Sequence, residues 1–137
     1  MEGNQNQQKY YYSWNELEED IKKIAVWASG KSFSGIYGIP RGGLIPAVLL
    51  SHQIGIPLVF SKNEINSNML IIDDMVDTGK TMGIIEKSLG FRPTVVSLFF
   101  EESALFVPDF FVRKKELWVV FPWETEASSR YDGTGSS

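Results

Sequence analysis

Three carboxylates and a turn of small residues stand next to each other near the middle of the chain. Asp73, Asp74 and Asp77 fall within five residues, and Thr78-Gly79-Lys80-Thr81 follows at once. Carboxylate oxygens suit Mg²⁺, and a small-residue turn at the start of a helix offers backbone N–H groups to a phosphate. Because the carboxylates would repel a bare phosphate, the pattern indicates a phosphorylated ligand that brings a metal ion or ribose hydroxyls.

A second turn, earlier in the chain, is also suited to an anion. Pro40-Arg41-Gly42-Gly43 stands between a short apolar run at 35–39 and a helical pattern at 44–54. Arg41 supplies a forked cation, while the two glycines allow backbone N–H groups to converge on one point. We therefore predict two anion-binding turns, each placed between a strand and a helix.

The elements around these turns predict an α/β fold. Helical patterns occur at 14–29, 44–54 and 82–89, and strand-like runs occur at 35–39, 56–60, 69–72, 94–100, 109–112 and 117–121. Their alternation favours a parallel sheet covered on both faces, with ligands bound beside the carboxyl ends of the strands. The strand at 69–72 is expected to end before Asp73. Neighbouring strand residues face opposite ways, so only then can Asp73 and Asp74 serve one site.

The composition narrows the class of protein. With 137 residues, 43% of them hydrophobic and 22% charged, the chain is expected to form one domain with a substantial core. A net charge of −4 argues against a nucleic-acid partner, and the lack of cysteine excludes disulfides and thiolate metal sites. No apolar run has the length of a membrane span and the start does not resemble a signal peptide. We therefore expect a cytoplasmic protein without a membrane partner.

Both turns resemble motifs of one enzyme family. Residues 69–81 resemble the diphosphate-sugar motif of the type I phosphoribosyltransferases: an apolar strand, two acidic residues, two apolar residues, then Asp-Thr-Gly-x-Thr. Residues 38–46 resemble the pyrophosphate loop of the purine enzymes, which carries an unusual peptide bond, here expected within 40–42. The segments 107–112 and 117–124 resemble the base-binding end of the hypoxanthine-guanine and xanthine-guanine branch.

This resemblance implies a fold and a reaction. We expect one phosphoribosyltransferase-like domain over 10–124, with a mostly parallel sheet flanked by helices and flexible ends at 1–9 and 125–137. The implied reaction is Mg²⁺-dependent. It transfers a 5-phosphoribosyl group from phosphoribosyl diphosphate to a nucleobase and releases pyrophosphate. Family members are usually dimers or tetramers, so a homodimer or homotetramer is also expected.

The resemblance also assigns roles in binding the sugar diphosphate. Asp73 and Asp74 would hold Mg²⁺ and the ribose hydroxyls, while the turn at 78–81 would hold the 5-phosphate. The turn at 40–42 would bind the diphosphate, and Arg41 would stabilise the charge that develops on the leaving pyrophosphate.

Base recognition is implied by four further residues. Asp77 would lie near the base nitrogen and assist its proton transfer, Trp118 would stack on the base, and Val119 would offer backbone contacts. Where the family has a lysine that donates to the oxygen at C6, this chain has Glu101, which cannot donate to a carbonyl when ionised. Two interpretations stay open: Glu101 accepts from an amino group of the base, or it points to solvent.

Three function classes follow from these patterns. The leading one is a purine-type phosphoribosyltransferase; the others are a catalytically weak phosphoribosyl-diphosphate or nucleotide sensor, and a phosphoribosyltransferase for a pyrimidine or other nucleophile. The connection at 61–68 is too short for the mobile hood usual in the family, which favours the sensor. The basic run Arg113-Lys114-Lys115 is expected on a solvated face.

Overall fold

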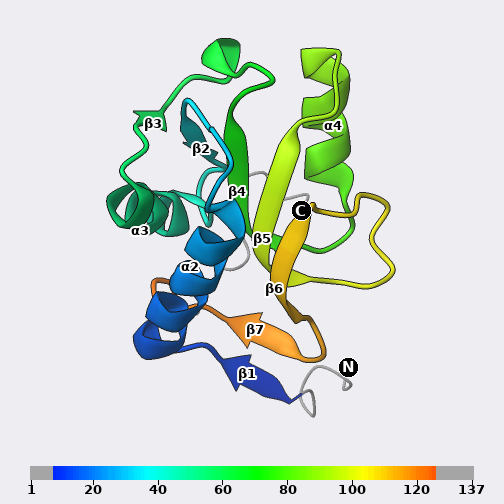
Figure 1. The fold of residues 1–137 in the computed structure, drawn as a ribbon. Coiled ribbons are helices and arrows are strands. Elements are labelled where there is room, and N and C mark those ends of the chain that lie inside the picture. The colour runs from blue at the N-terminus through cyan, green and yellow to red at the C-terminus, as the bar shows by residue number, and fades with distance from the viewer. Residues whose placement is uncertain (1–7, 126–137) are drawn as a thin grey trace.

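A parallel five-stranded sheet forms the centre of the molecule (Figure 1). The computed structural model describes residues 8–125. The strands are β2 (Ile36–Gly38), β3 (Leu58–Val59), β4 (Leu70–Val76), β5 (Thr94–Phe100) and β6 (Phe110–Lys114). They lie in the order β3-β2-β4-β5-β6, and every neighbouring pair is parallel. The predicted α/β class with a mostly parallel sheet is confirmed.

Helices cover both faces of this sheet. One core cluster joins α2 (Trp14–Ala28) and α3 (Leu44–Ile54) to one face through residues such as Ile24, Leu50 and Ile72. A second cluster joins α4 (Lys80–Leu89) to the other face through residues such as Ile85 and Ile71. Ile71 and Ile72 are adjacent in β4 yet belong to different clusters, as the alternation of side chains along a strand requires.

The strand order reverses between β2 and β4. From β2 the chain runs through α3 to the edge strand β3, and then returns to β4 on the other side of β2. A short 3₁₀ helix, η1 (Lys62–Glu64), lies in that return. In parallel sheets the crevice at such a reversal, beyond the carboxyl ends of the strands, is where ligands bind. Both predicted anion-binding turns follow the two strands that flank this point.

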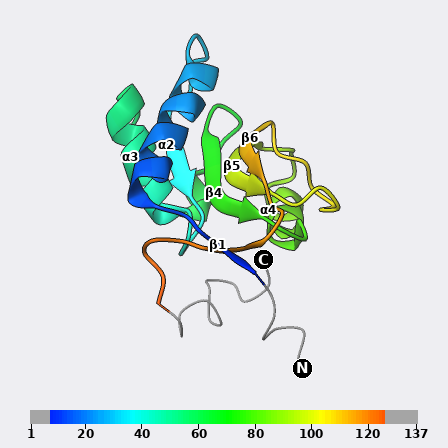
Figure 2. The same cartoon turned by 90° about the horizontal axis from the view of Figure 1, so that it is seen from below.

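A small second sheet was not predicted from the sequence. β1 (Lys9–Tyr11) pairs in parallel with β7 (Trp118–Val120), and Tyr10 is opposite Val119. In Figure 1 this pair lies below the main sheet, at the end where β6 leads into β7, and Figure 2 views the molecule from that side. β1 begins one residue before the predicted domain start at residue 10. The predicted flexible ends otherwise lie almost wholly outside the described residues.

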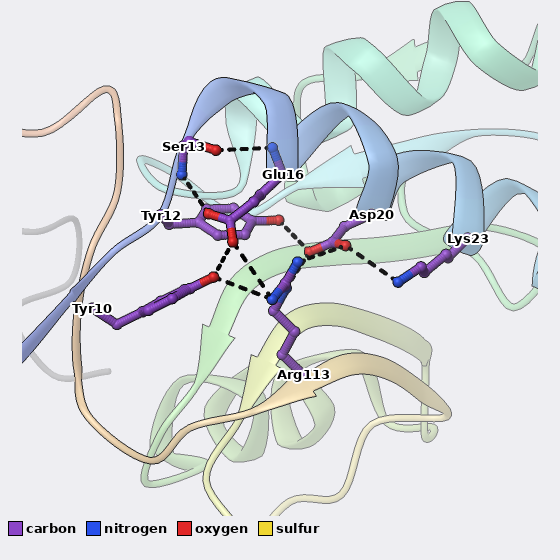
Figure 3. Close-up of polar contacts among 7 residues, drawn as sticks. All are labelled: Tyr10, Tyr12, Ser13, Glu16, Asp20, Lys23 and Arg113. Atoms are coloured by element: carbon purple, nitrogen blue, oxygen red, sulfur yellow. Dashed lines mark hydrogen bonds and ion pairs between the residues drawn. The ribbon is translucent and has the colours of Figure 1, made fainter.

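Polar contacts fix the start of α2 to the end of β6 (Figure 3). The residues involved are Tyr10, Tyr12, Ser13, Glu16, Asp20, Lys23 and Arg113. Asp20 is fully buried and accepts hydrogen bonds from Arg113 Nε at 2.6 Å and from the Tyr12 hydroxyl at 2.6 Å. Ser13 and Glu16 form the capping box that the sequence predicted. The network therefore ties β1, α2 and β6 into one unit.

Most predicted elements match the structure, but β4 is longer than expected. It runs from Leu70 through Asp73 and Asp74 to Val76, so the prediction of a strand that ends before Asp73 is wrong. The strand continues because β5 pairs along its whole length, with Asp73 opposite Ser97 and Val76 opposite Phe100. Within residues 8–125, none of the helices has the length and apolar character needed to cross a membrane.

Candidate active site

The arginine-glycine turn lies directly against the acidic strand. The turn packs so closely that a Cβ atom at Gly42 would lie 2.0 Å from Asp74 Oδ2. Glycine leaves room for that carboxylate, so the arginine-glycine turn lies beside the acidic strand that leads to the turn at 78–81. Arg41 is exposed, and the peptide bond between Pro40 and Arg41 is cis, where the family resemblance predicted an unusual bond.

The two adjacent carboxylates of β4 face different parts of the site. Asp74 points to the Gly42 turn, on the α3 side, whereas Asp73 lines a small pocket with Gly79, Thr81 and other residues on the α4 side. Both are about 5% exposed, and Asp73 Oδ1 accepts a hydrogen bond of 2.8 Å from the backbone N–H of Asp74. Because the strand has not ended, these side chains flank the strand instead of converging on one point.

The turn that leads into α4 has the features of a phosphate-binding turn. Gly79 is the N-cap with φ +88°, and no side chain caps the helix there. A Cβ atom at Gly79 would lie 2.5 Å from the backbone nitrogen of Phe106. Thr78 Oγ1 accepts from the backbone N–H of Lys80 at 3.1 Å, while Thr81 is buried beside the pocket of Asp73. Gly79 is therefore required both by its backbone conformation and by the segment that packs over it.

Asp77 is held by a lysine that the sequence analysis placed on a solvated face. Lys115 follows β6, and its Nζ lies 3.1 Å from Asp77 Oδ1. The same Nζ lies 5.8 Å from the centroid of the Trp118 ring, within the range of cation–π attraction. The Lys115 side chain is 20% exposed, so the expectation of a solvated charge is wrong for this residue.

The other members of the basic run also differ from one another. Arg113 is bound to buried Asp20, whereas Lys114 is exposed and pairs at 3.3 Å with the exposed Glu102. Only Lys114 fits the sequence-based expectation. No local signal in the sequence separates these three residues, because their partners Asp20, Glu102 and Asp77 come from distant segments.

Glu101 is engaged locally. Its carboxylate accepts hydrogen bonds from the backbone N–H and the hydroxyl of Ser103, at 3.2 and 3.1 Å. These bonds, with a smaller contribution from the charge of Lys115, keep the pKa of Glu101 below its ordinary value. Contact between Glu101 and a base stays a prediction.

Trp118 and Val119 occupy different environments on β7. Trp118 is 40% exposed, and Lys115 Nζ lies over its ring. Val119 is buried in the core cluster that also contains Tyr12 and Phe99. Its side chain therefore serves packing, and any contact with a base would come from its backbone, as predicted.

The carboxylates of the site fit Mg²⁺ only where a ligand and water supply further oxygens. Over residues 8–125, no group of three or more His, Asp or Glu side chains is arranged to hold a metal ion by itself. Mg²⁺ at phosphate sites is bound by one or two carboxylates together with substrate oxygens and water. Because Asp73 and Asp74 face opposite sides of β4, one carboxylate with substrate oxygens and water fits that role, and Asp74 is the one beside the arginine-glycine turn.

The fold and this arrangement define a class of protein. An α/β sheet that presents an arginine-glycine turn, an acidic strand and an Asp-Thr-Gly-x-Thr turn at its switch point has the organisation of a phosphoribosyltransferase domain.

Comparisons with known proteins identify the family, although no protein-family model matches the chain. The xanthine-guanine phosphoribosyltransferase of Desulfotalea psychrophila is 30% identical, over 90% of this chain and 91% of that protein. The enzyme of that name from Gluconobacter oxydans is 29% identical, over 91% and 92%. The crystal structure of a purine phosphoribosyltransferase from Pyrococcus horikoshii has a TM-score of 0.74 at 34% identity, covering 85% of this chain and 95% of that one.

The chain therefore belongs to the type I phosphoribosyltransferase family and lies close to its purine phosphoribosyltransferases. It is a phosphoribosyltransferase enzyme, and the resemblance noted in its sequence is confirmed.

Proposed function

We propose that this enzyme transfers the 5-phosphoribosyl group of phosphoribosyl diphosphate to a 6-oxopurine in the presence of Mg²⁺ and releases pyrophosphate. The observation that carries the proposal is the close approach of the Arg41-Gly42 turn to the acidic strand, in which the Asp74 carboxylate occupies the space beside Gly42. A ribose with phosphates at both ends suits a strand that has one anion-binding turn beside Asp74 and the other beside Asp73. The printed names of the relatives, xanthine-guanine phosphoribosyltransferases, support an oxopurine as the acceptor.

The sugar diphosphate is bound by the two turns that follow strands β4 and β2. The turn at 78–81 holds the 5-phosphate at the start of α4, where the helix dipole favours an anion. The turn at 40–42 holds the diphosphate, and Arg41 stabilises the negative charge that builds on the leaving pyrophosphate. Asp73 and Asp74 receive hydrogen bonds from ribose hydroxyls. When bound, Mg²⁺ would neutralise charge on the diphosphate, and Asp74, whose carboxylate lies beside the diphosphate-binding turn, would hold it together with substrate oxygens and water.

The base is held between β4 and β7. Its ring stacks on Trp118 and contacts the backbone of Val119, while a ring N–H donates to Asp77. In the transfer, the bond from the ribose C1′ to the diphosphate oxygen breaks and a bond from C1′ to the base nitrogen forms. Asp77 assists the loss of the proton that the base gives up.

The test is a pyrophosphate-release assay with phosphoribosyl diphosphate and guanine, xanthine, hypoxanthine, adenine or uracil, each with and without Mg²⁺. We expect Mg²⁺-dependent release with oxopurines. Release with uracil alone would move the assignment to the pyrimidine class. Release that is the same in the presence of a chelator would remove Mg²⁺ from the proposal.

A sensor function is the second candidate, and it is favoured by the connection between β3 and β4. That connection holds only the 3₁₀ helix Lys62–Glu64 and short flanking turns, too little chain to close over a reacting centre. Calorimetry separates the two functions. Micromolar binding of phosphoribosyl diphosphate, with no release of its pyrophosphate in the presence of any of the bases, would establish the sensor. A cytoplasmic location and a dimeric or tetrameric state stay predictions, the latter to be checked by solution scattering.

A further inference from the structure

Lys115 stands at the place where the proposed base meets the protein. Its backbone N–H donates to the Phe100 carbonyl at 2.8 Å, which fixes it at the carboxyl end of β5. From there its side chain reaches Asp77 at 3.1 Å and lies 5.8 Å from the Trp118 ring centroid. One ammonium group therefore lies beside both the proposed proton acceptor and the proposed stacking surface.

Neither Glu101 nor Lys114 offers the same chemistry. Glu101 presents a carboxylate that is already bonded to Ser103, and a carboxylate cannot donate to a carbonyl. Lys114, the next residue to Lys115, is exposed and pairs with Glu102 at 3.3 Å. Of the cations on this segment, Lys115 is the one that lies at the site.

We propose that Lys115 is the residue that selects 6-oxopurines, by donating a hydrogen bond to the C6 oxygen of a base stacked on Trp118. The inference rests on the proposed function and deepens it. It gives this chain a C6 donor from the segment after β6, in place of the lysine that the family resemblance expects at Glu101.

The protein and one edge of a 6-oxopurine present matched donors and acceptors. The oxygen at C6 and the ring nitrogen N7 lie side by side on one edge of a 6-oxopurine. When N7 carries the proton, that edge presents a donor and an acceptor. Asp77 and Lys115 present the complementary acceptor and donor 3.1 Å apart. A 6-aminopurine in the same pose presents two donors, so its amino group meets the Lys115 ammonium without an acceptor.

The side chain can make this contact without leaving Asp77. An ammonium group has three N–H donors, and the ion pair with Asp77 uses one direction. The Lys115 side chain is 20% exposed and its ammonium lies 5.8 Å from the Trp118 ring centroid, so its remaining donors are within reach of a base bound at that ring. The ion pair thus positions the donor before a base arrives, which reduces the entropy lost on binding.

The test compares Lys115→Met with Lys114→Met, a matched control on the adjacent residue. For Lys115→Met we expect kcat/KM with hypoxanthine and guanine to fall about 10- to 100-fold, as for loss of a charged hydrogen bond. The loss should appear in the KM of the base, with the KM of phosphoribosyl diphosphate unchanged. Activity with adenine should stay the same or rise. Lys114→Met should match the wild type with every base.

A second measurement does not depend on turnover. Calorimetry should show that the wild type binds GMP more tightly than AMP and that Lys115→Met loses this preference, while thermal unfolding confirms that the variant is folded. An unchanged ratio of oxopurine to adenine activity in Lys115→Met would overturn the inference. So would an equal loss with all bases, because Lys115 would then act only through Asp77. If the wild type prefers GMP but releases no pyrophosphate, the proposed function fails and the selectivity inference stands.

Discussion

The buried ion pair between α2 and β6 gives a sharp stability prediction. Asp20 has 0% exposure, and Arg113 binds it through Nε at 2.6 Å and through a second guanidinium nitrogen at 3.3 Å. Replacing Arg113 by Met keeps much of the side-chain volume and removes the charge. Asp20 would then keep only the Tyr12 hydroxyl at 2.6 Å and a long contact of 3.8 Å to Lys23.

The cost follows from the charge that is left behind. Removing one partner of a buried pair typically costs about 3–5 kcal/mol, because the other charge stays buried without compensation. The Arg113 side chain is 31% exposed and Tyr12 still donates, so we expect the lower end, about 3 kcal/mol. A domain of this size is stable by about 5–15 kcal/mol, so the loss is a large fraction. The melting temperature should fall by roughly 10 °C.

Equilibrium unfolding in urea measures this effect, with Lys114→Met as the control on the same strand. The Lys114–Glu102 pair is exposed at both ends, 54% and 74%, so its loss should change the free energy of unfolding by less than about 1 kcal/mol. The double variant Asp20→Asn with Arg113→Met should lose less than the sum of the two single changes. An Arg113→Met protein within about 1 kcal/mol of the wild type would refute the reasoning.

Three further predictions concern single residues. Burial and the hydrogen bond to Asp20 raise the pKa of Tyr12 far above its ordinary value of 10.0, so its contribution to stability is complete below that pH and is lost above it. Unfolding titrations of Tyr12→Phe should therefore show a weaker loss of stability at alkaline pH; an identical slope would contradict this. Gly79→Ala should weaken phosphoribosyl-diphosphate binding in calorimetry and destabilise the fold by more than about 1 kcal/mol, because its φ is +88° and its Cβ would meet Phe106. Gly83→Ala, where a Cβ has open space in the same helix, should be neutral or stabilising. Trp118→Ala should raise the KM of the base about fivefold through loss of stacking, and an unchanged KM would exclude the stacking role.

The sequence predicted the elements that depend on local signals. The helix 44–54 and the strand 94–100 match the structure residue for residue, and the capping box at Ser13 starts α2 as expected. The predictions that failed concerned features that depend on pairing between distant segments. β4 extends past Asp73 because β5 supplies hydrogen bonds along it, and β1 exists only because β7 lies beside it. No local pattern in either strand contains that information.

The same limit explains why Lys115 was missed. As a sequence, Arg113-Lys114-Lys115 is a short run of like charges, and such runs usually face solvent. In the structure the three residues bind Asp20 in α2, Glu102 after β5 and Asp77 after β4, which are three different partners from distant parts of the chain. The position at which β6 ends therefore decides which partner each of these residues meets.

The segment that joins β6 to β7 therefore connects stability with specificity. Arg113 fixes the end of β6 to α2, and two residues later Lys115 reaches Asp77 beside Trp118. If Arg113 is lost, the end of β6 has one anchor fewer, and Lys115 is held less firmly at the carboxyl end of β5. Arg113→Met should then raise the KM of an oxopurine in addition to lowering stability, even at a temperature where the variant is fully folded. Asp20→Asn should do the same, because it acts on the same anchor. Steady-state kinetics of both variants with hypoxanthine check this. A normal KM in a destabilised Arg113→Met protein would show that the ion pair between Arg113 and Asp20 contributes to stability but not to base binding.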